Sequence, residues 1–211
     1  MAYASHLRCI GCAKEYPVES VMNLCPHDNR PVEIIIDTER LQFDLPGFKW
    51  FHPEIKSMWR FGALLALDIN DDKDRGNIIS LGEGYTPLIP LHDFPLANKV
   101  GFKLFLKDEG QPHPGYGRNP TASFKDRGMS MVASMAKKLG SHRLAVPTQG
   151  NAGDSLTEYA LHAGFEIVVA MPDDTPMPIL GRVAAMEKLH AQVHLELVNG
   201  TIRDANELLK E

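Results

Sequence analysis

The sequence contains few cysteines: three in 211 residues, all within the first 25. So few thiols at one end argue against a disulfide framework, and they favour a reducing compartment, so we expect a cytoplasmic protein. No apolar run approaches the length of a membrane span, and the first residues lack the apolar core of a secretory signal peptide. Positive charge is not in excess either, because the net charge is -5. We therefore expect neither a nucleic-acid partner nor a membrane.

What remains is ordinary for a globular chain, with 44% hydrophobic and 23% charged residues. From residue 81 onward, short apolar runs alternate with segments of helical periodicity. Strands are expected at 103–106, 144–147, 167–171 and 192–198, and helices follow to about 139, up to Gly164, at 178–189 and at 201–210. This alternation predicts an α/β fold with an open, mostly parallel sheet flanked by helices. Ligands of such sheets bind at the carboxyl ends of the strands.

The most informative segment is residues 119–128, which read Asn-Pro-Thr-Ala-Ser-Phe-Lys-Asp-Arg-Gly. Ser123 and Asp126 fit a capping pattern, so Lys125 is expected on the first turn of a helix. A cation is disfavoured at a helix N-terminus, and a lysine there should lose its proton more readily. A neutral amine is what Schiff-base formation with an aldehyde requires. The alternative is a surface lysine on an ordinary helix, and position alone does not decide between the two.

This segment resembles the lysine motif of threonine synthases, which are pyridoxal-phosphate enzymes of fold type II. Further segments resemble the same family in the expected order. They are Met58-Trp-Arg-Phe61, Leu81-Gly-Glu-Gly-Tyr-Thr-Pro-Leu88, Phe105-Leu-Lys-Asp-Glu109 and Pro147-Thr-Gln-Gly-Asn-Ala-Gly153. The resemblance implies a lyase of threonine biosynthesis that converts O-phosphohomoserine to threonine and phosphate, with pyridoxal 5'-phosphate as cofactor.

The resemblance also implies roles for individual residues. Lys125 would bind the cofactor covalently and later transfer a proton, and Asn151 would contact the cofactor ring hydroxyl. Ser123 and Lys107 are weaker candidates for the pocket wall. The amino-acid substrate would be bound by the loop Thr148, Gln149, Gly150, Asn151 and Ala152. Because this loop precedes a helix, its amide groups favour a carboxylate.

Two departures from the family pattern leave the substrate open. Residues 111–118 form a Gly- and Pro-rich insertion, in which His113 is expected to be a solvated loop residue. Gly153-Asp154 stands where small residues are more usual. An alternative is therefore another fold type II enzyme that performs β-replacement or elimination on a different amino acid.

A second alternative is a truncated, non-catalytic homologue. No segment after Met171 resembles the family's glycine-rich cradle for the cofactor phosphate, and the helix at 201–211 ends without a Gly or Pro terminator. We therefore expect residues 81–211 to be the N-terminal part of a catalytic domain. The isolated chain is expected to be inactive and to form a homodimer or depend on a complementing C-terminal half.

The first 80 residues are expected to form two further parts. Residues 1–37 resemble a zinc ribbon, such as threonine synthases often carry, with Cys9, Cys12 and Cys25 as ligands. Asp28 or His27 could complete a structural zinc site, and the alternative is a ribbon that no longer binds metal. Residues 38–80 are expected to be a connecting arm that packs on the catalytic body, with the charge run 71–75 as a solvated loop.

Overall fold

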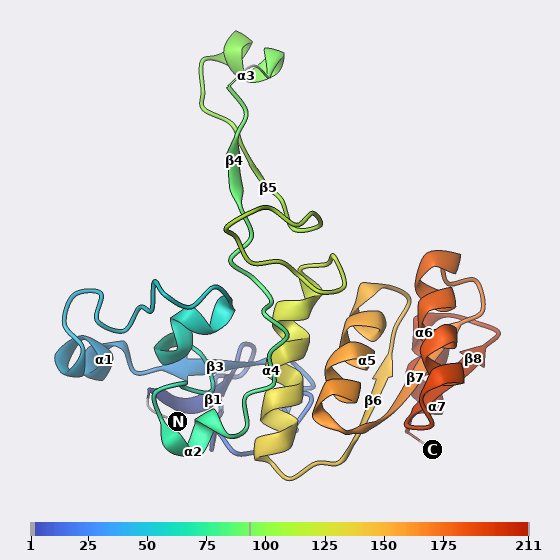
Figure 1. Cartoon of the computed structure of the whole chain (residues 1–211). Helices are drawn as coiled ribbons and strands as arrows, with labels where there is room; N and C mark the ends of the chain where they lie inside the picture. Colours follow the sequence, from blue (N-terminus) through green and yellow to red (C-terminus); the bar gives the residue numbers. More distant parts are fainter. Residues whose placement is uncertain (1–2, 93, 211) are drawn as a thin grey trace. The chain divides into compact units, whose positions relative to one another are not determined.

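The computed structural model describes residues 3–92 and 94–210, which divide into two compact units (Figure 1). The first unit contains the described residues of Met1–Ile55 together with Trp59–Ile79 and Met131–His142. The second unit contains Lys56–Met58, Ser80–Ser130 and the described residues of Arg143–Glu211. The chain therefore passes between the units several times, and helix α4 (Lys125–Lys138) contributes to both.

The first unit begins with a small antiparallel sheet of strand order β2-β1-β3. Its strands are β1 (Ala4–Cys9), β2 (Glu15–Tyr16) and β3 (Val32–Ile36). Helix α1 (Thr38–Asp44) follows, and the Asp37 carboxylate caps it by accepting a hydrogen bond from the Arg40 amide at 2.9 Å. One cluster of its core is formed by Tyr3, Leu41 and Ala63. Residues of the expected connecting segment thus supply part of a packed core.

The charge run at residues 71–75 is a short helix, α2 (Asp72–Arg75), and not the solvated loop that we expected. Asp71 caps it by accepting from the Lys73 amide. The helical turn directs Asp74 inward, where its side chain is fully buried and pairs with the Lys138 ammonium. The prediction was wrong here because a pattern of charges does not show which carboxylate will be buried against a cation distant in the sequence. A 3₁₀ segment, η1 (Met58–Leu64), precedes α2 in the chain.

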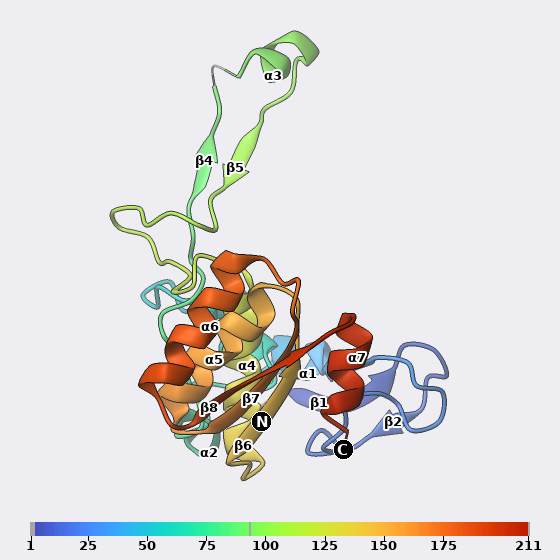
Figure 2. The same ribbon diagram turned by 90° about the vertical axis from the view of Figure 1, so that its right-hand side faces the viewer.

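The second unit is built on a parallel sheet of strand order β6-β7-β8. Its strands are β6 (Arg143–Pro147), β7 (Glu166–Pro172) and β8 (Val193–Val198). Helices α5 (Asn151–Ala163) and α6 (Met177–Leu189) cover one face, and α7 (Ile202–Leu208) covers the other (Figure 2). The α/β class is confirmed. The sheets are only partly parallel, because the other strand pairs in the described chain are antiparallel.

Burial explains why this part follows the sequence pattern closely. The central strand β7 places Ile167, Val169 and Met171 at 0% exposure, as expected for a parallel strand covered on both faces. Helix α5 ends at Gly164, whose φ of +75° is the left-handed conformation that glycine adopts readily. The loop between β6 and α5 lies at the carboxyl end of β6.

The remaining strands, β4 (Leu88–Pro90) and β5 (Phe105–Lys107), pair with each other as an antiparallel hairpin. The short helix α3 (Pro95–Val100) lies in the connection between them. The expected strand at 103–106 is therefore displaced toward Lys107. None of the helices in the described part of the chain is long and apolar enough to cross a membrane.

Candidate functional site

Lys125 is the first residue of α4, as the capping pattern predicted. The Ser123 hydroxyl oxygen accepts a hydrogen bond from the Lys125 amide at 3.2 Å, and Ala122 has a φ of +59°. This left-handed turn is unusual for alanine and brings the chain sharply into the helix. The half-buried Lys125 ammonium lies 5.0 Å from the centre of the Phe124 ring, and among the described residues it has no hydrogen bond or ion pair. The amine is therefore available to a ligand.

The next residue, Asp126, fixes the start of this helix. Its side chain is fully buried and accepts hydrogen bonds from the Thr121 amide at 2.8 Å and the Thr121 hydroxyl at 2.6 Å. It also accepts one from the Ser155 hydroxyl of α5, at 2.6 Å. Asp126 thus joins the lysine loop to the first turns of α5.

Glu109 holds the other side of the lysine loop. Arg127 donates two hydrogen bonds to its carboxylate, at 2.7 and 2.9 Å, and the Asn119 amide donates a third at 2.7 Å. Burial tends to raise the pKa of Glu109, but the Arg127 guanidinium and these hydrogen bonds outweigh it and hold the pKa below its usual value. Asn119 also accepts from the Gly84 amide at 3.1 Å. The loop is consequently fixed at both ends by carboxylates.

Glu83 is a third buried carboxylate, at 0% exposure. It accepts hydrogen bonds from the Ser130 hydroxyl of α4 at 2.7 Å and the Tyr159 hydroxyl of α5 at 2.8 Å. Burial, and then the Glu83 charge, raise the pKa of Tyr159 well above its usual value, so its hydroxyl stays protonated as a donor. Glu83 therefore connects Ser130 of α4 with Tyr159 of α5, about one helical turn after the contact between Asp126 and Ser155.

The loop between β6 and α5 is organised by Thr148, which is buried. Its hydroxyl oxygen accepts from the amides of Gly150 and Gly153, at 3.2 and 3.1 Å. A Cβ at Gly153 would lie 2.2 Å from the Thr148 methyl carbon, so this position requires glycine. The Gln149 side chain donates to Asp174 at 2.9 Å. The exposed Asn151 side chain has no hydrogen-bond partner within the described chain, so its amide is available to a ligand.

Asp154, which departs from the family pattern, has a structural role in this unit. Its side chain is buried and lies 3.0 Å from the Arg182 guanidinium of α6. Burial raises the pKa of Asp154, and Arg182 opposes this rise by stabilising the carboxylate. The carboxylate thus joins α5 to α6.

The inserted segment 111–118 is anchored to neighbouring residues. The Gly117 amide donates to the Tyr85 carbonyl at 3.1 Å, and the rings of Tyr85 and Tyr116 are 5.7 Å apart. His113, which we expected to be solvated, is half-buried and bonds to Asp108 at 2.8 Å. A neighbouring carboxylate, which a single sequence does not reveal, explains this difference. The insertion therefore has a defined conformation beside the lysine loop.

In the first unit, the three cysteines and Asp28 form a compact cluster whose four candidate ligand atoms all lie within 4.8 Å of one another. The sulfurs of Cys12 and Cys25 are 3.7 Å apart, and Cys9 lies 3.2 Å from an Asp28 oxygen. Zinc bonded tetrahedrally to sulfur at about 2.3 Å requires sulfur–sulfur separations of roughly 3.8 Å, so the geometry fits. Burial raises the pKa of Asp28, but the Arg30 amide and the thiols lower it further, to about 2. His27 is exposed and outside the cluster.

Comparison with known proteins decides the family. A family model described as pyridoxal-phosphate dependent enzyme matches residues 79–211. The chain belongs to this family. The threonine synthase of Methanosarcina acetivorans is 31% identical over 209 residues, which cover 97% of this chain and 45% of the relative. That of Methanocaldococcus jannaschii is 33% identical over 205 residues, covering 97% of this chain and 46% of the relative. The predicted resemblance to threonine synthases is confirmed.

The chain thus spans about half the length of these curated family members. Among solved structures, a hydrogen sulfide-producing enzyme from Fusobacterium nucleatum is 21% identical, with a TM-score of 0.49. The matched region covers 66% of this chain and 42% of the Fusobacterium nucleatum enzyme.

The structure brings some predicted site residues together and gives others internal partners. Lys125, Ser123 and the loop that carries Asn151 belong to one unit and are connected through Asp126 and Ser155. Lys107 lies on β5, where its ammonium donates to the Thr86 carbonyl. The sequence reasoning missed the supporting carboxylates Glu83 and Glu109, and it identified Asp126 only as a capping residue. A usable signal was available, because each acid stands inside a motif that resembles the family.

Proposed function

We propose that this chain forms part of a threonine synthase-like lyase that converts O-phosphohomoserine to threonine and phosphate. The observation that carries the proposal is the environment of Lys125. Its amine has no polar partner among the described residues, and it lies at the start of α4. The next residue, Asp126, is held by hydrogen bonds from Thr121 and Ser155. The lysine motif and the 31–33% identity to threonine synthases over 97% of the chain support it. We also propose residues 81–211 as the N-terminal part of the catalytic domain, after a ribbon at 1–37 and an arm at 38–80.

The residues present suit pyridoxal phosphate, since both Lys125 and Asn151 have unengaged polar groups within the described chain. When bound, the cofactor supplies an electron sink for chemistry at an amino acid. Lys125 would hold it covalently and, once substrate takes that place, carry a proton on its Nζ. Asn151 would contact the ring hydroxyl, and Ser123 would support the pocket wall. The backbone of residues 148–152, at the start of α5, would bind the substrate carboxylate.

The test is chemical trapping. The full chain is titrated with pyridoxal phosphate and reduced with borohydride, and the modified peptide is identified by mass spectrometry. We expect modification at Lys125, loss of it in Lys125→Ala, and no change in Lys188→Ala, an exposed lysine on α6. Modification of Lys103 or Lys107 in preference to Lys125 would contradict the assignment.

A second candidate function is β-replacement or elimination on another amino acid. The anchored insertion at 111–118 favours it, since this segment departs from the family pattern beside the lysine loop. A panel of phosphorylated and unphosphorylated amino acids, offered to the chain in an active assembly, separates the candidates. Threonine release from O-phosphohomoserine alone supports the first function. Release of a ketoacid or of a substituted amino acid from other substrates supports the second.

We further propose a structural zinc ion bound by Cys9, Cys12, Cys25 and Asp28. Three thiolates with separations that suit tetrahedral coordination support it, as does an Asp28 carboxyl that is ionised at neutral pH. Zinc would join the β1–β2 turn to the segment that precedes β3 and so stabilise the small sheet. A homodimer and a cytoplasmic location remain predictions.

Metal analysis of protein purified without chelator tests the zinc proposal. We expect one zinc per chain, reduced strongly in Cys9→Ser and Asp28→Ala and unchanged in His27→Ala, the matched control outside the cluster. A chelator should lower the melting temperature of the wild type. Zinc far below one equivalent that none of these substitutions changes would leave a metal-free ribbon.

A further inference from the structure

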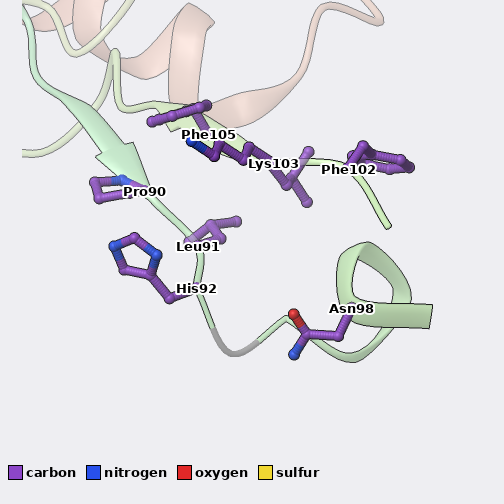
Figure 3. Close-up of a pocket in the computed structure, with 8 residues that line it drawn as sticks. Pro90, Leu91, His92, Asn98, Phe102, Lys103 and Phe105 are labelled. Carbon is purple, nitrogen blue, oxygen red and sulfur yellow. The ribbon is translucent and has the colours of Figure 1, made fainter. Parts of the chain in front are cut away.

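Two features of the described chain play no part in the chemistry proposed for Lys125. The first is a pocket of about 250 Å³ beside α3, lined mainly by Leu91, Phe102 and Phe105 (Figure 3). Its described lining includes one histidine and one lysine but no carboxylate or thiol, which is too few groups for a metal site. The second feature is the group of three cysteines and Asp28, which we call the thiol cluster. Polar contacts around the thiol cluster extend beyond its four candidate ligands.

Tyr16 contacts the thiol cluster although it is not one of the candidate ligands. Its hydroxyl oxygen lies 3.0 Å from the Cys25 sulfur, which is within hydrogen-bond distance. Cys25 is fully buried, and its sulfur also lies 3.7 Å from the sulfur of Cys12. A cysteine binds a metal ion as the thiolate, which has no proton to donate. In a metal-bound cluster, Tyr16 must therefore be the donor and Cys25 the acceptor.

The fold fixes the position of this hydroxyl. Tyr16 is the last residue of β2 and pairs with Leu7 of β1, the strand that ends at Cys9. The Cys25 backbone is held separately, because its amide donates to the Arg30 carbonyl at 2.8 Å. Tyr16 thus reaches from the small sheet to a cysteine on a different segment of the chain. Backbone hydrogen bonds hold both partners in place without the help of a metal ion.

The Cys9 sulfur also accepts hydrogen bonds, but from the backbone. Its donors are the amides of Gly11 and Cys12, at 3.3 and 3.4 Å. Cys25 differs because one of its donors is a side chain. A side-chain donor can be removed by a single substitution that leaves the backbone unchanged. Tyr16 is therefore the support of the thiol cluster that can be tested alone.

The charge of the ligand set gives such a donor a function. Three thiolates and the Asp28 carboxylate carry four negative charges, and a zinc ion offsets only two of them. Hydrogen bonds to the ligands disperse the excess charge and orient the ligand atoms, and their loss typically weakens metal binding about 10–100-fold. The Arg30 amide donates to Asp28 at 3.1 Å, and the Tyr16 hydroxyl is placed to do the same for Cys25.

We propose that Tyr16 is a positioning residue of the metal site, which donates a hydrogen bond to the Cys25 thiolate and so orients it and disperses its charge. The proposal rests on the zinc ion proposed for the thiol cluster, and it adds a residue that does not itself bind the metal. It is independent of the chemistry proposed for Lys125. Tyr16→Phe keeps the ring and the backbone pairing with β1, and it removes only the donor.

The experiment uses the full 211-residue chain, kept reduced, freed of metal and then loaded with zinc or cobalt(II). Competition with a chromogenic chelator gives the zinc Kd, and absorption spectroscopy gives the sulfur-to-cobalt charge-transfer band. We expect Tyr16→Phe to weaken zinc binding roughly tenfold or more. The band should shift to lower energy, because a thiolate without its hydrogen bond gives up electron density more readily. A merely structural role would not shift this band at saturating cobalt(II).

Tyr116→Phe is the matched control, because it removes a hydroxyl from a ring that is 49% exposed and lies in the other unit. It should leave the zinc Kd and the band unchanged. Tyr16→Phe should also lower the melting temperature of the zinc-bound chain more than that of the metal-free chain. The proposal alone is overturned if Tyr16→Phe binds zinc as the wild type does, if its band is unshifted, or if both forms lose equal stability. A wild type that binds neither metal overturns the zinc proposal together with this one.

Discussion

Asp126→Asn should destabilise the protein strongly although it removes no atom from the core. One carboxylate oxygen accepts from the hydroxyls of Thr121 and Ser155, and the other accepts from the Thr121 amide. Asparagine can keep a carbonyl oxygen for the two hydroxyls. Its amide nitrogen then faces the Thr121 N–H, so two donors meet in a site that is fully buried.

The magnitude follows from these contacts. A buried N–H left without an acceptor costs about 1–3 kcal/mol. The two hydroxyl bonds lose their charge assistance, at roughly 0.5–1 kcal/mol each. The free energy of unfolding should therefore fall by about 2–5 kcal/mol, a large part of the roughly 5–15 kcal/mol typical of a domain. Ser155→Ala should cost less, because the carboxylate keeps both bonds from Thr121.

Urea unfolding followed by far-UV circular dichroism is the assay. Tryptophan fluorescence is less suitable, because Trp50 and Trp59 both belong to the other unit. Glu207→Gln is the control, since it neutralises an exposed carboxylate paired with Lys210 and should change stability by less than about 0.5 kcal/mol. A loss for Asp126→Asn below about 1 kcal/mol, or no larger than that of the control, would refute the reasoning.

Two further predictions concern the same unit. Gly153→Ala should lower the melting temperature, because overpacking against Thr148 at about 1–3 kcal/mol exceeds the helix propensity gained. Gly128→Ala, where a Cβ meets no atom within 4 Å, should raise it slightly. The pKa of Glu109 is lower in the folded state than in the unfolded state. The stabilisation that Glu109 contributes is therefore complete above its unfolded pKa of about 4.3, and it is lost as the pH falls through its folded pKa. Arg127→Ala should therefore flatten the decline in stability measured by urea unfolding between about pH 6 and pH 3.

Much of the second unit could be predicted because burial is periodic there. The strands at 144–147 and 167–171 and the helix that ends at Gly164 match the structure within about a residue or two. The spacing of apolar residues in these elements indicates which of their faces are buried against neighbouring elements. The first 80 residues were less predictable, since β1 and α1 are short and stabilised by contacts distant in sequence, such as the Tyr3 core.

The candidate site was predictable at the residues that face a ligand and not at those that support them. Lys125 and Asn151 were identified from motifs whose chemistry is recognisable. The partners of Glu109 and Glu83 could not be, because Arg127 and Tyr159 are separated from them by 18 and 76 positions in the chain. The position of a carboxylate inside a motif marks it as a candidate, but it does not identify the residues that will bond to it.

Lys125 has a side chain that is available to a ligand, whereas its neighbour Asp126 is a buried carboxylate that supports the backbone. The start of α5 carries a similar pair, Asn151 and Asp154. A reacting group must be available, so Lys125 and Asn151 have no polar side-chain partner among the described residues, while Asp126 and Asp154 are buried and engaged. Each pair joins an available side chain to a carboxylate that fixes the backbone nearby. Chemistry and stability should consequently separate by single substitutions. Lys125→Ala should leave the free energy of unfolding within about 0.5 kcal/mol, because no described hydrogen bond is lost. If Lys125→Ala lowered the free energy of unfolding as much as Asp126→Asn does, Lys125 itself would support the fold.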